Sequence, residues 1–315
     1  MDSGRVLVIG GNGFLGVNIV AELLGRGMDV AVLDIHPPRE AAPGVQYYCG
    51  AVGDRELLAE CVRGRQCIVY LKSSTTPATS MLDAAKAYCE DLPDLMATCQ
   101  MCLQQGVRKI VFASSGGTVY GDLKIQRPYR EDDPTHPRNH YGIAKVAAEN
   151  ILLMYNALHD MENIILRISN PYGKGQNSLS GVGAITAFAE RIVHDEPIHI
   201  YGDGNIIRDY IEVSDVAGAF AAAVTLKPDC DSPVFNVGSG AGVSLLELVE
   251  ILQKSMQRQA TIEFFPRRQF DVLYNVLDIS KAKAHLGFAP SILLEDGIGR
   301  HTARLKLKEK ASDGF

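Results

Sequence analysis

Tyr141 and Lys145 are the two residues of this chain whose types and spacing first suggest chemistry. They stand four positions apart in a helix-like run, so their side chains are neighbours on one helix face. A nearby ammonium group favours the ionised phenol and lowers the pKa of a tyrosine from its ordinary value of about 10. We therefore expect Tyr141 to move a proton on and off a substrate hydroxyl. The alternative is an ordinary helix surface with a solvated lysine.

A glycine-rich turn near the start of the chain could bind a dinucleotide. Gly10, Gly13 and Gly16 have the spacing GxxGxxG between an expected strand and an expected helix. The first two glycines let the backbone turn tightly and approach a pyrophosphate at the helix N-terminus, where free N–H groups attract anions. The third lets the helix pack closely on the strand. The turn opens a βαβ unit, which is the context that a dinucleotide site requires.

Asp34 follows the next apolar strand and indicates which dinucleotide would bind. A carboxylate at this position accepts hydrogen bonds from ribose hydroxyls and repels a 2′-phosphate. The sequence therefore favours NAD over NADP, although His36 and Arg39 lie close by and could accompany a phosphate.

Strand-like and helix-like segments alternate through the first half of the chain. Residues 6–9, 30–33 and 110–113 are continuous apolar runs, as expected of strands covered on both faces. Parallel strands joined by crossover helices follow from this order. The elements expected here span residues 5–9, 12–26, 29–33, 45–49, 55–63, 67–71, a long helical stretch up to 105, 109–113, 141–159 and 164–168.

After Asn170 the sequence pattern changes: glycine-rich turns separate short, unevenly spaced elements. We expect an α/β fold, with a Rossmann-type, doubly wound parallel sheet over residues 1–169, to which 209–232 return. A smaller α+β substrate-binding lobe would contain 170–208 and 233–315. Further helices are expected over 182–193, 214–225 and 244–257, with a strand over 198–201.

Composition and charge exclude several classes of protein. The chain has 315 residues, 46% hydrophobic and 22% charged, as in soluble globular proteins. A net charge of −6 argues against nucleic acid or an anionic membrane as a partner. No apolar run is long enough for a membrane helix and no secretory signal is recognisable, so we expect a cytoplasmic protein. Seven scattered cysteines indicate reduced thiols, and the Cys99/Cys102 pair has no second pair or histidine nearby, so no metal site is predicted.

With these residues assembled, the chain resembles the extended short-chain dehydrogenase/reductase family, in particular the nucleotide-sugar epimerases and dehydratases typified by UDP-glucose 4-epimerase. The resemblance covers nearly the whole chain. Besides the glycine turn and the Tyr141/Lys145 pair, the matching segments are SSGGTVYG at 114–121, RISNPYG at 167–173, RDYI at 208–211, RRQFDV at 267–272, DISKA at 278–282 and LG at 286–287.

The resemblance implies a reaction and a role for each residue. In such enzymes the tyrosine takes the proton of the sugar 4-hydroxyl while hydride leaves C4 for NAD, and the lysine lowers the tyrosine pKa and binds the nicotinamide ribose. A serine or threonine after the preceding strand shares the hydrogen bond of the hydroxyl. By this resemblance the NAD contacts are Gly10, Asn12, Gly13, Phe14, Leu15, Gly16, Asp34, Ile35, Ala51, Val52, Leu71, Lys72, Ser73, Ala113, Ser114, Tyr141, Lys145 and Pro171.

The chain departs from the family pattern in several places, two of which concern the expected site. The turn that carries the assisting hydroxyl is one residue longer than usual, so Ser115 is the expected group and Thr118 the alternative. Lys72 and Ser73 stand where the family usually has two alanines. The lysine could contact the pyrophosphate or the substrate, or it could turn outward.

Asn170, Arg208 and Arg268 match the substrate contacts of the family, together with Ser115. A nucleotide sugar carries a diphosphate of charge about −2, and the planar fork of arginine binds such oxygens in pairs. For each arginine the alternative is a surface salt bridge. The loop around 178–184 would read the sugar.

These observations favour an NAD-dependent epimerase that inverts C4 of a UDP-hexose. The turn 116–118 lacks the carboxylates of a 4,6-dehydratase, and Asp34 disfavours a 4-keto-reductase that consumes NADPH. Both stay alternatives, as does a uronic acid decarboxylase. A sensor or scaffold that only binds NAD is a non-enzyme alternative, but such proteins tend to lose the tyrosine or the lysine. The family resemblance also implies a homodimer.

Overall fold

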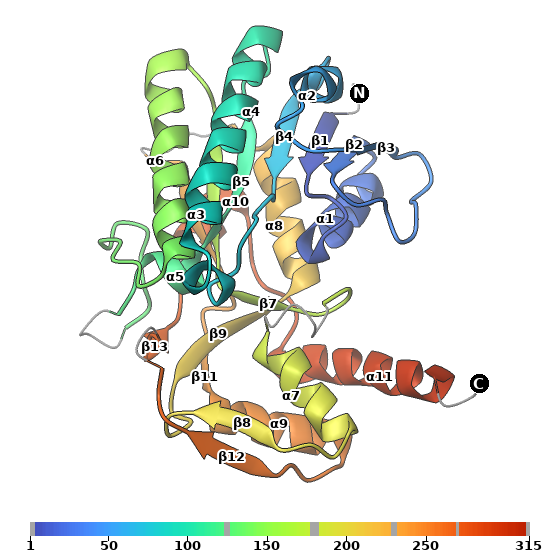
Figure 1. Cartoon of the computed structure of the whole chain (residues 1–315), viewed down its shortest axis with the longest axis vertical. Helices are drawn as coiled ribbons and strands as arrows, with labels where there is room; N and C mark the ends of the chain where they lie inside the picture. The colour runs from blue at the N-terminus through green and yellow to red at the C-terminus, as the bar shows by residue number, and fades with distance from the viewer. Residues whose placement is uncertain (1–3, 123–126, 177–182, 228–231, 269–270, 313–315) are drawn as a thin grey trace.

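The structure, a computed structural model, describes residues 4–122, 127–176, 183–227, 232–268 and 271–312. Its main feature is a sheet of seven strands, each parallel to its neighbours, in the order β10-β6-β5-β4-β1-β2-β3 (Figure 1). This arrangement confirms the predicted Rossmann-type sheet. The strands are β1 (Arg5–Ile9), β2 (Asp29–Asp34), β3 (Gln46–Cys49), β4 (Cys67–Tyr70), β5 (Ile110–Ser115), β6 (Ile164–Ile168) and β10 (Val234–Val237).

Helices cover both faces of this sheet. Successive strand residues point to opposite faces. Val6 and Val8 pack into the core under α1, α8 and α10, whereas Leu7 and Ile9 pack into the core under α2, α4 and α6. This double coverage explains why the strands are continuous apolar runs. The helices are α1 (Phe14–Gly25), α8 (Val213–Thr225), α10 (Ser280–Leu286), α2 (Arg55–Val62), α4 (Leu92–Gln105) and α6 (His140–His159).

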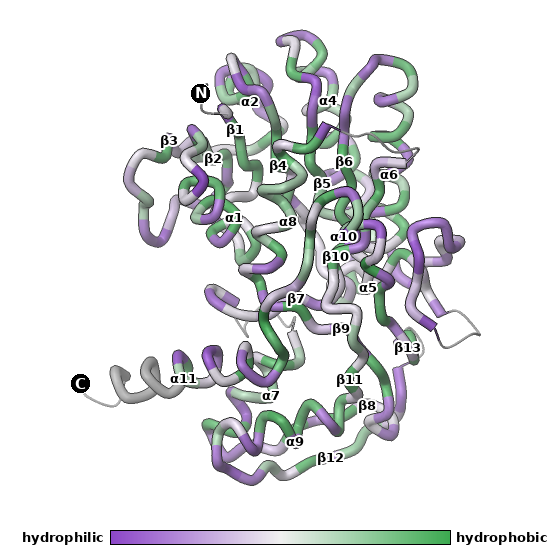
Figure 2. Tube along the Cα trace, turned by 180° about the vertical axis from the view of Figure 1, so that it is seen from behind, coloured by the Kyte–Doolittle hydropathy of each residue, from purple (hydrophilic) through white to green (hydrophobic). Residues whose placement is uncertain are grey.

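A smaller unit lies beyond the carboxyl ends of the large-sheet strands (Figure 1). It contains a four-stranded sheet, in which β9 pairs with β7, β11 and β13, and a two-stranded sheet of β8 and β12. Apolar faces of three helices form its core, and green and purple alternate along α9 in Figure 2. The elements are β7 (Asn170–Tyr172), α7 (Ala184–Val193), β8 (Ile198–Tyr201), β9 (Ile207–Glu212), β11 (Gly242–Ser244), α9 (Leu245–Met256), β12 (Ile262–Phe265), β13 (Tyr274–Asn275) and α11 (Leu294–Ser312).

The predicted division of the chain differs from the structure at two strands. Residues 209–212 were expected with the large sheet but belong to β9 of the smaller unit. We expected residues 233–315 in the smaller unit, but β10 pairs with β6 at the edge of the large sheet, and α10 packs against it. The short run Val234–Val237 is fully buried, so it behaves like the other strands of the large sheet. The remaining boundaries of the division stay a prediction.

The long helical stretch before residue 105 is interrupted. A 3₁₀ turn, η1 (Thr79–Met81), and a short helix, α3 (Ala84–Lys86), lead into a π-helical turn, η2 (Ala87–Asp91), which continues directly into α4. A π turn contains one extra residue per turn, so it changes the face on which the following side chains lie.

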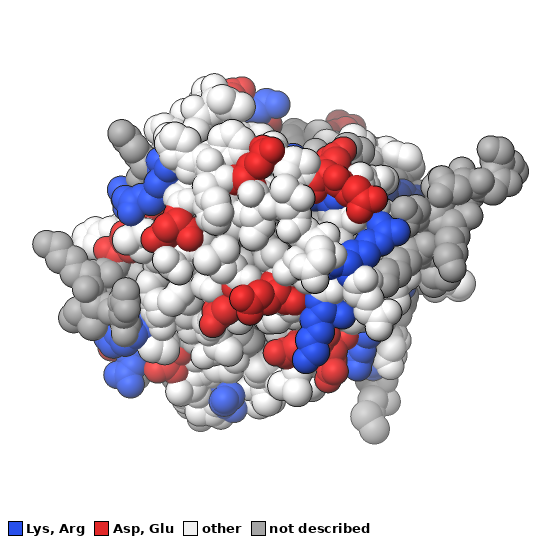
Figure 3. Space-filling view, turned by 90° about the horizontal axis from the view of Figure 1, so that it is seen from below, with Lys and Arg blue, Asp and Glu red and all other residues white. Residues whose placement is uncertain are grey.

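The outer surface shows no strong separation of charge on the face drawn in Figure 3. Basic side chains are scattered singly or in small groups among acidic ones there. Among the residues that the structure describes, no helix is both long and apolar enough to span a bilayer.

Candidate active site

Tyr141 and Lys145 lie in the first turns of α6, where the helix meets the end of β5. Asn139 caps the helix, since its side chain accepts a hydrogen bond from the Gly142 N–H at 2.8 Å. Lys145 donates from Nζ to the carbonyl oxygen of Ala113 at 2.8 Å, and Nζ lies 5.4 Å from the centre of the Tyr141 ring. The cap and this hydrogen bond together fix both side chains against the sheet.

Ser115 is the hydroxyl that contacts Tyr141. Strand β5 continues to Ser115, two residues beyond its expected end at residue 113, and the short helix α5 (Gly116–Val119) begins directly after it. Ser115 and Tyr141 line the same cavity, and the Ser115 hydroxyl acts on the phenol so as to lower the pKa of Tyr141. Thr118 lies one turn further on and donates to the Ser115 carbonyl at 3.5 Å.

Residues from the end of the chain hold this lengthened turn in place. Asn275 donates from Nδ2 to the carbonyl oxygen of Gly116 at 2.9 Å. A Cβ on Gly116 would lie 2.6 Å from the Leu277 side chain, so only glycine fits at this contact. The position of Ser115 thus depends on a segment more than a hundred residues later.

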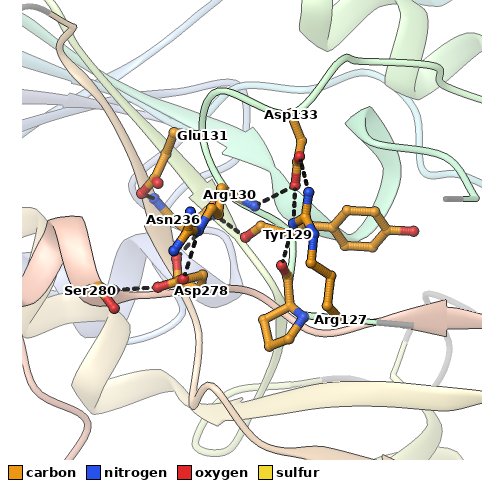
Figure 4. A network of polar contacts seen from close by, with 9 residues as sticks. Arg127, Tyr129, Arg130, Glu131, Asp133, Asn236, Asp278 and Ser280 are labelled. Carbon is orange, nitrogen blue, oxygen red and sulfur yellow. Dashed lines mark hydrogen bonds and ion pairs between the residues drawn. The ribbon is translucent and has the colours of Figure 1, made fainter. Parts of the chain in front are cut away.

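A polar network fastens that late segment to the large sheet (Figure 4). Tyr129 bridges the two, because its N–H donates to the Val276 carbonyl at 2.8 Å and its own carbonyl accepts from Asn236 Nδ2 at 2.9 Å. Nearby, Arg127 pairs with Asp133 at 2.6 Å. The network stabilises the segment that carries Asn275 and Leu277.

Burial dominates the electrostatics of the pair. It raises the pKa of Tyr141 to about 12, with the negative charge of Asp91 acting in the same direction and the hydrogen bond from Ser115 opposing both. Burial also lowers the pKa of Lys145 from 10.5 to about 8, although the charges of Asp91 and Glu149 raise it. The ammonium group of Lys145 bonds to the Ala113 carbonyl, and burial of the phenol is the largest influence on the pKa of Tyr141. The expected role of Lys145 in lowering that pKa stays a prediction.

The glycine turn has the shape that a dinucleotide requires. Gly10 has a φ of +81°, and Gly13 is the N-terminal cap of α1, whose first N–H groups are open to an anion. A Cβ on Gly16 would lie 2.5 Å from the carbonyl oxygen of Gly10. Helix α1 can therefore approach the turn only because residue 16 is glycine, and the turn fits a bound pyrophosphate.

Asp34 stands at the end of β2, beside this turn. Its Oδ2 accepts from the Asn12 N–H and its Oδ1 from the His36 N–H, each at 3.0 Å. Each carboxylate oxygen has a further lone pair, so the fixed carboxylate suits two ribose hydroxyls and opposes a phosphate. The residues therefore fit NAD.

Some of the other expected NAD contacts lie beside Asp34, and the rest line a cavity next to Tyr141 and Lys145. Ile35 and Ala51 are exposed beside Asp34, and Val52 is buried. Ser114 turns its hydroxyl into the core, where it donates to Glu149. Phe14, Leu15, Leu71, Ser73, Ala113, Ser114 and Pro171 line one cavity together with Tyr141 and Lys145.

Lys72 does not extend into this cavity. Its ammonium group contacts Asp91 at 3.0 Å and Asp94 at 2.8 Å. Of the possibilities that the sequence left open, the structure has the side chain turned away from the glycine turn and paired with two carboxylates.

The cavity has a volume of about 540 Å³ and extends from the glycine turn to the smaller unit. Arg208, Arg268 and Tyr201 of the smaller unit line it, and Asn170 lines it nearer to Ser115. Arg208 donates to the Ile207 carbonyl at 3.0 Å, and burial lowers its pKa. Asn170 donates to the Asp209 carbonyl at 2.9 Å.

Arg268 lies over an aromatic ring at this end of the cavity. Its guanidinium carbon is 4.0 Å from the centre of the Tyr201 ring, and Nε lies 3.5 Å from Asp271. The Arg268 guanidinium over the Tyr201 ring suits a planar nucleotide base, and Arg208, which lines the same cavity, suits the attached phosphates.

Comparison with known proteins agrees with this geometry. Residues 6–238 match the model of the NAD dependent epimerase/dehydratase family. The chain belongs to this family. It is an NAD-dependent enzyme that modifies nucleotide sugars, and 4-epimerases and a 4-dehydro-sugar reductase occur among its relatives.

Three epimerase/dehydratase relatives show the range of similarity. A dTDP-4-dehydro-6-deoxyglucose reductase of Escherichia coli is 32% identical, with 96% of this chain and 98% of the relative covered. The crystal structure of UDP-glucose 4-epimerase from Thermotoga maritima with UDP-glucose is 29% identical, with a TM-score of 0.90 and coverage of 97% and 99%. The UDP-glucose 4-epimerase of Thermus thermophilus in complex with NAD is 30% identical, with a TM-score of 0.88 and coverage of 96% and 99%.

Two residues at the site of this epimerase/dehydratase family member were not predicted from the sequence. Tyr201 ends an expected strand before a glycine turn, a pattern that could have drawn attention to it. Asp91 falls in a helical stretch, where it reads as a surface residue. Residues 178–182, expected to help read the sugar, lie outside the described residues. No group of three or more metal-ligating side chains occurs within the described ranges.

Proposed function

We propose that this protein is an NAD-dependent nucleotide-sugar epimerase that inverts C4 of a UDP-hexose through a 4-keto sugar. One observation carries the proposal: a single cavity joins the glycine turn side of the large sheet, the Tyr141, Lys145 and Ser115 side chains, and the arginines of the smaller unit. The volume of about 540 Å³ lies in the usual range for ligand pockets. A molecule that spans this cavity needs a sugar at the middle and phosphates at the far end.

Each of the three central residues has a role in the proposed reaction. Tyr141 accepts the proton of the 4-hydroxyl as the C4–H bond breaks, and it returns a proton when the C4–H bond forms again. Ser115, which lines the cavity with Tyr141, shares the hydrogen bond of the 4-hydroxyl and orients it toward the phenol. NAD held by the glycine turn and Asp34 would supply a hydride acceptor and donor for C4 and a positive charge near the phenol. A cation favours the phenolate, so it opposes the effect of burial on Tyr141.

Arg208 and Arg268 would hold the nucleotide while the sugar turns. An epimerase must present both faces of the 4-keto sugar to the same cofactor, which requires firm contacts at the diphosphate and loose ones at the sugar. Arg208 is suited to this task because its guanidinium faces the cavity with donors to spare.

Reduction of a 4-keto sugar is the second candidate, because the E. coli reductase is 32% identical over nearly the full length of both chains. Such an enzyme would use the same tyrosine and lysine but would consume a reduced cofactor. Asp34 supports the epimerase, because its fixed carboxylate opposes the 2′-phosphate of NADPH.

The experiment is conversion of single UDP-sugars by the purified protein without added cofactor, followed by proton NMR. UDP-glucose, UDP-N-acetylglucosamine and UDP-glucuronic acid should each be tried, with the dTDP-sugars as a second panel. An epimerase produces the C4 epimer from at least one of them, with no net change in NAD or NADH. A second assay adds NADH or NADPH together with a dTDP-4-keto sugar. Oxidation of the added cofactor there, with no interconversion of epimers in the first assay, would instead establish the reductase.

We also propose a homodimer, as the family resemblance implies. Met96 on α4 and Ile143, Met154 and Leu158 on α6 are large apolar side chains exposed on neighbouring helices. Light scattering of the purified protein gives its mass in solution and tests this directly.

A further inference from the structure

An ion pair lies across a small cavity from Tyr141 and Lys145. Lys72 contacts Asp91 at 3.0 Å and Asp94 at 2.8 Å. Asp91 is held in place by its neighbours as well, since it accepts from the Ser74 N–H at 2.9 Å and from the Ser73 hydroxyl at 3.3 Å. Both side chains are mostly buried, with 22% of Lys72 and 16% of Asp91 exposed. Charges in such surroundings act strongly on one another.

The two pairs border the same small cavity. Its volume is about 20 Å³, and Lys72, Asp91, Tyr141 and Lys145 all line it. The Tyr70 hydroxyl, also on its wall, is buried and has no hydrogen-bond partner among the described residues. There is room for about one water molecule, so little solvent separates the charge of Asp91 from the ammonium group of Lys145.

The backbone places Asp91 there by an irregular turn. Asp91 is the last residue of the π-helical turn η2, just before α4. Turns of this kind are rare and are often found at functional sites. The carboxylate reaches the cavity from this turn, while Asp94 lies in the first turn of α4.

The charged groups that face Lys145 come from three elements. Asp91 comes from η2, Lys72 from the segment after β4, and Glu149 from α6 itself. Glu149 is already engaged, because Arg167 pairs with it at 2.7 Å in the core. Asp91 is therefore the carboxylate whose charge is divided between Lys72 and the active site.

We propose that Asp91 is a positioning residue that keeps Lys145 in its ammonium form, and that Lys72 limits the effect of Asp91 on Tyr141. The inference rests on the proposed role of Tyr141 and Lys145, and it extends that role to a pair outside the substrate cavity. Asp91 favours the charged lysine, but it also opposes the phenolate. Lys72 reduces both effects, so the balance between the two side chains sets the pH range of proton transfer.

Opposite changes are expected for the two partners. Asp91→Asn removes the anion, so the pKa of Lys145, about 8 in the wild type, should fall. Lys72→Met leaves Asp91 with less neutralisation, so the pKa of Lys145 should rise and the phenolate of Tyr141 should form at higher pH. Asp94→Asn is the matched control, because Asp94 also contacts Lys72 yet is not among the charges that shift Lys145.

The test is a titration of Lys145 by NMR, with lysine labelled with ¹³C at Cε and the protein saturated with NAD. The resonance is assigned by its loss in Lys145→Met. The inference predicts a midpoint about half a pH unit or more lower in Asp91→Asn, higher in Lys72→Met and unchanged in Asp94→Asn. Equal midpoints in all four proteins would overturn it.

The titration does not depend on knowing the substrate. If the midpoints move as predicted but no nucleotide sugar is converted, the inference stands and the proposed function fails. If a sugar is converted, the pH profile of kcat should move in the same direction as each midpoint, and an unmoved profile would overturn the inference.

A single variant that leaves an unpaired buried charge could fail to fold. The double variant Lys72→Met/Asp91→Asn removes both charges and provides the second measurement. Its Lys145 midpoint should lie between those of the two single variants, and a midpoint below that of Asp91→Asn would contradict the division of charge proposed here. Circular dichroism establishes that each variant is folded before titration.

Discussion

Lys145 and Ala113 are joined by a hydrogen bond of 2.8 Å between the ammonium nitrogen and a main-chain carbonyl oxygen. The bond links the first turns of α6 to the last residues of β5, so it holds the lysine at the end of the sheet, next to Tyr141. An ammonium group in this position is removed from water, and its pKa falls from 10.5 to about 8.

Lys145→Met should therefore stabilise the protein near neutral pH. The folded-state pKa lies below the unfolded one, so between pH 8 and 10.5 the unfolded state binds more protons and the stability of the wild type rises with pH. Below pH 8 the cost of burying the charge is fully present, up to roughly 3 kcal/mol. Urea unfolding should show the variant more stable at pH 7, with a difference that narrows by pH 10.5. The exposed Lys254→Met is the control, and a less stable Lys145→Met at both pH values would contradict the expectation.

Tyr141→Phe should retain NAD and lose turnover by a factor of about 100 or more, because it deletes the group that transfers the proton. Turnover is measured with whichever nucleotide sugar of the panel the wild type converts, and bound NAD is measured by its release from the denatured protein. Tyr47→Phe, on the edge strand β3, is the control for loss of a phenol elsewhere. Wild-type turnover in Tyr141→Phe would eliminate this residue as the proton carrier.

Asp34→Ala should weaken NAD binding and reduce discrimination against NADP. The variant removes the carboxylate that is fixed by Asn12 and His36 at the edge of the glycine turn. Calorimetric titration with both dinucleotides measures the preference. Asp29→Ala is the control at the opposite end of the same strand, and an unaltered preference in Asp34→Ala would show that another group selects the cofactor.

Arg208→Met should raise KM for the nucleotide sugar by about 10-fold or more, with a smaller change in kcat. The reason is that the guanidinium would donate charge-assisted hydrogen bonds to the phosphate oxygens, which the variant removes. UDP alone should also bind more weakly, which calorimetry measures without any turnover. The exposed Arg63→Gln serves as the control. Unchanged UDP binding in Arg208→Met would show that Arg208 does not bind the diphosphate.

Gly16→Ala and Gly25→Ala should have opposite effects on stability within one helix. A Cβ at residue 16 would lie 2.5 Å from backbone atoms of Gly10 and Gly11, whereas at residue 25 it would meet nothing within 4 Å. We expect a loss of about 1–3 kcal/mol and of NAD binding in the first variant, and a gain of up to about 1 kcal/mol in the second. Thermal unfolding compares the two, and equal stability would show that α1 can move away from the turn.

Features that depend on local spacing were predictable from the sequence. The glycine turn and Asp34 could be predicted because both belong to one βαβ unit. Lys145 could be predicted because it stands four residues after Tyr141 in the same helix. The choice between Ser115 and Thr118 was open, because an extra residue in a turn can be absorbed at either end. Strand β5 absorbs it by continuing to Ser115, a result that depends on contacts with Asn275.

Features that depend on distant contacts or irregular backbone were not predictable. Asp91 reaches the site from a π turn, which has no reliable sequence pattern, and Lys72 alone gave no indication of its partner. The placement of β10 failed for a similar reason, because a strand of three apolar residues and Asn236, followed by a glycine-rich turn, suits either sheet.

The position of β10 has a consequence for how this protein is made. Its strand joins the large sheet only after residues 170–233 have been synthesised, and the Asn275 side chain that supports the Ser115 turn comes later still. A chain that has emerged from the ribosome only as far as β6 contains the glycine turn, Tyr141 and Lys145, yet it has neither the edge of its sheet nor the far wall of its cavity. The catalytic groups are therefore translated first and supported last.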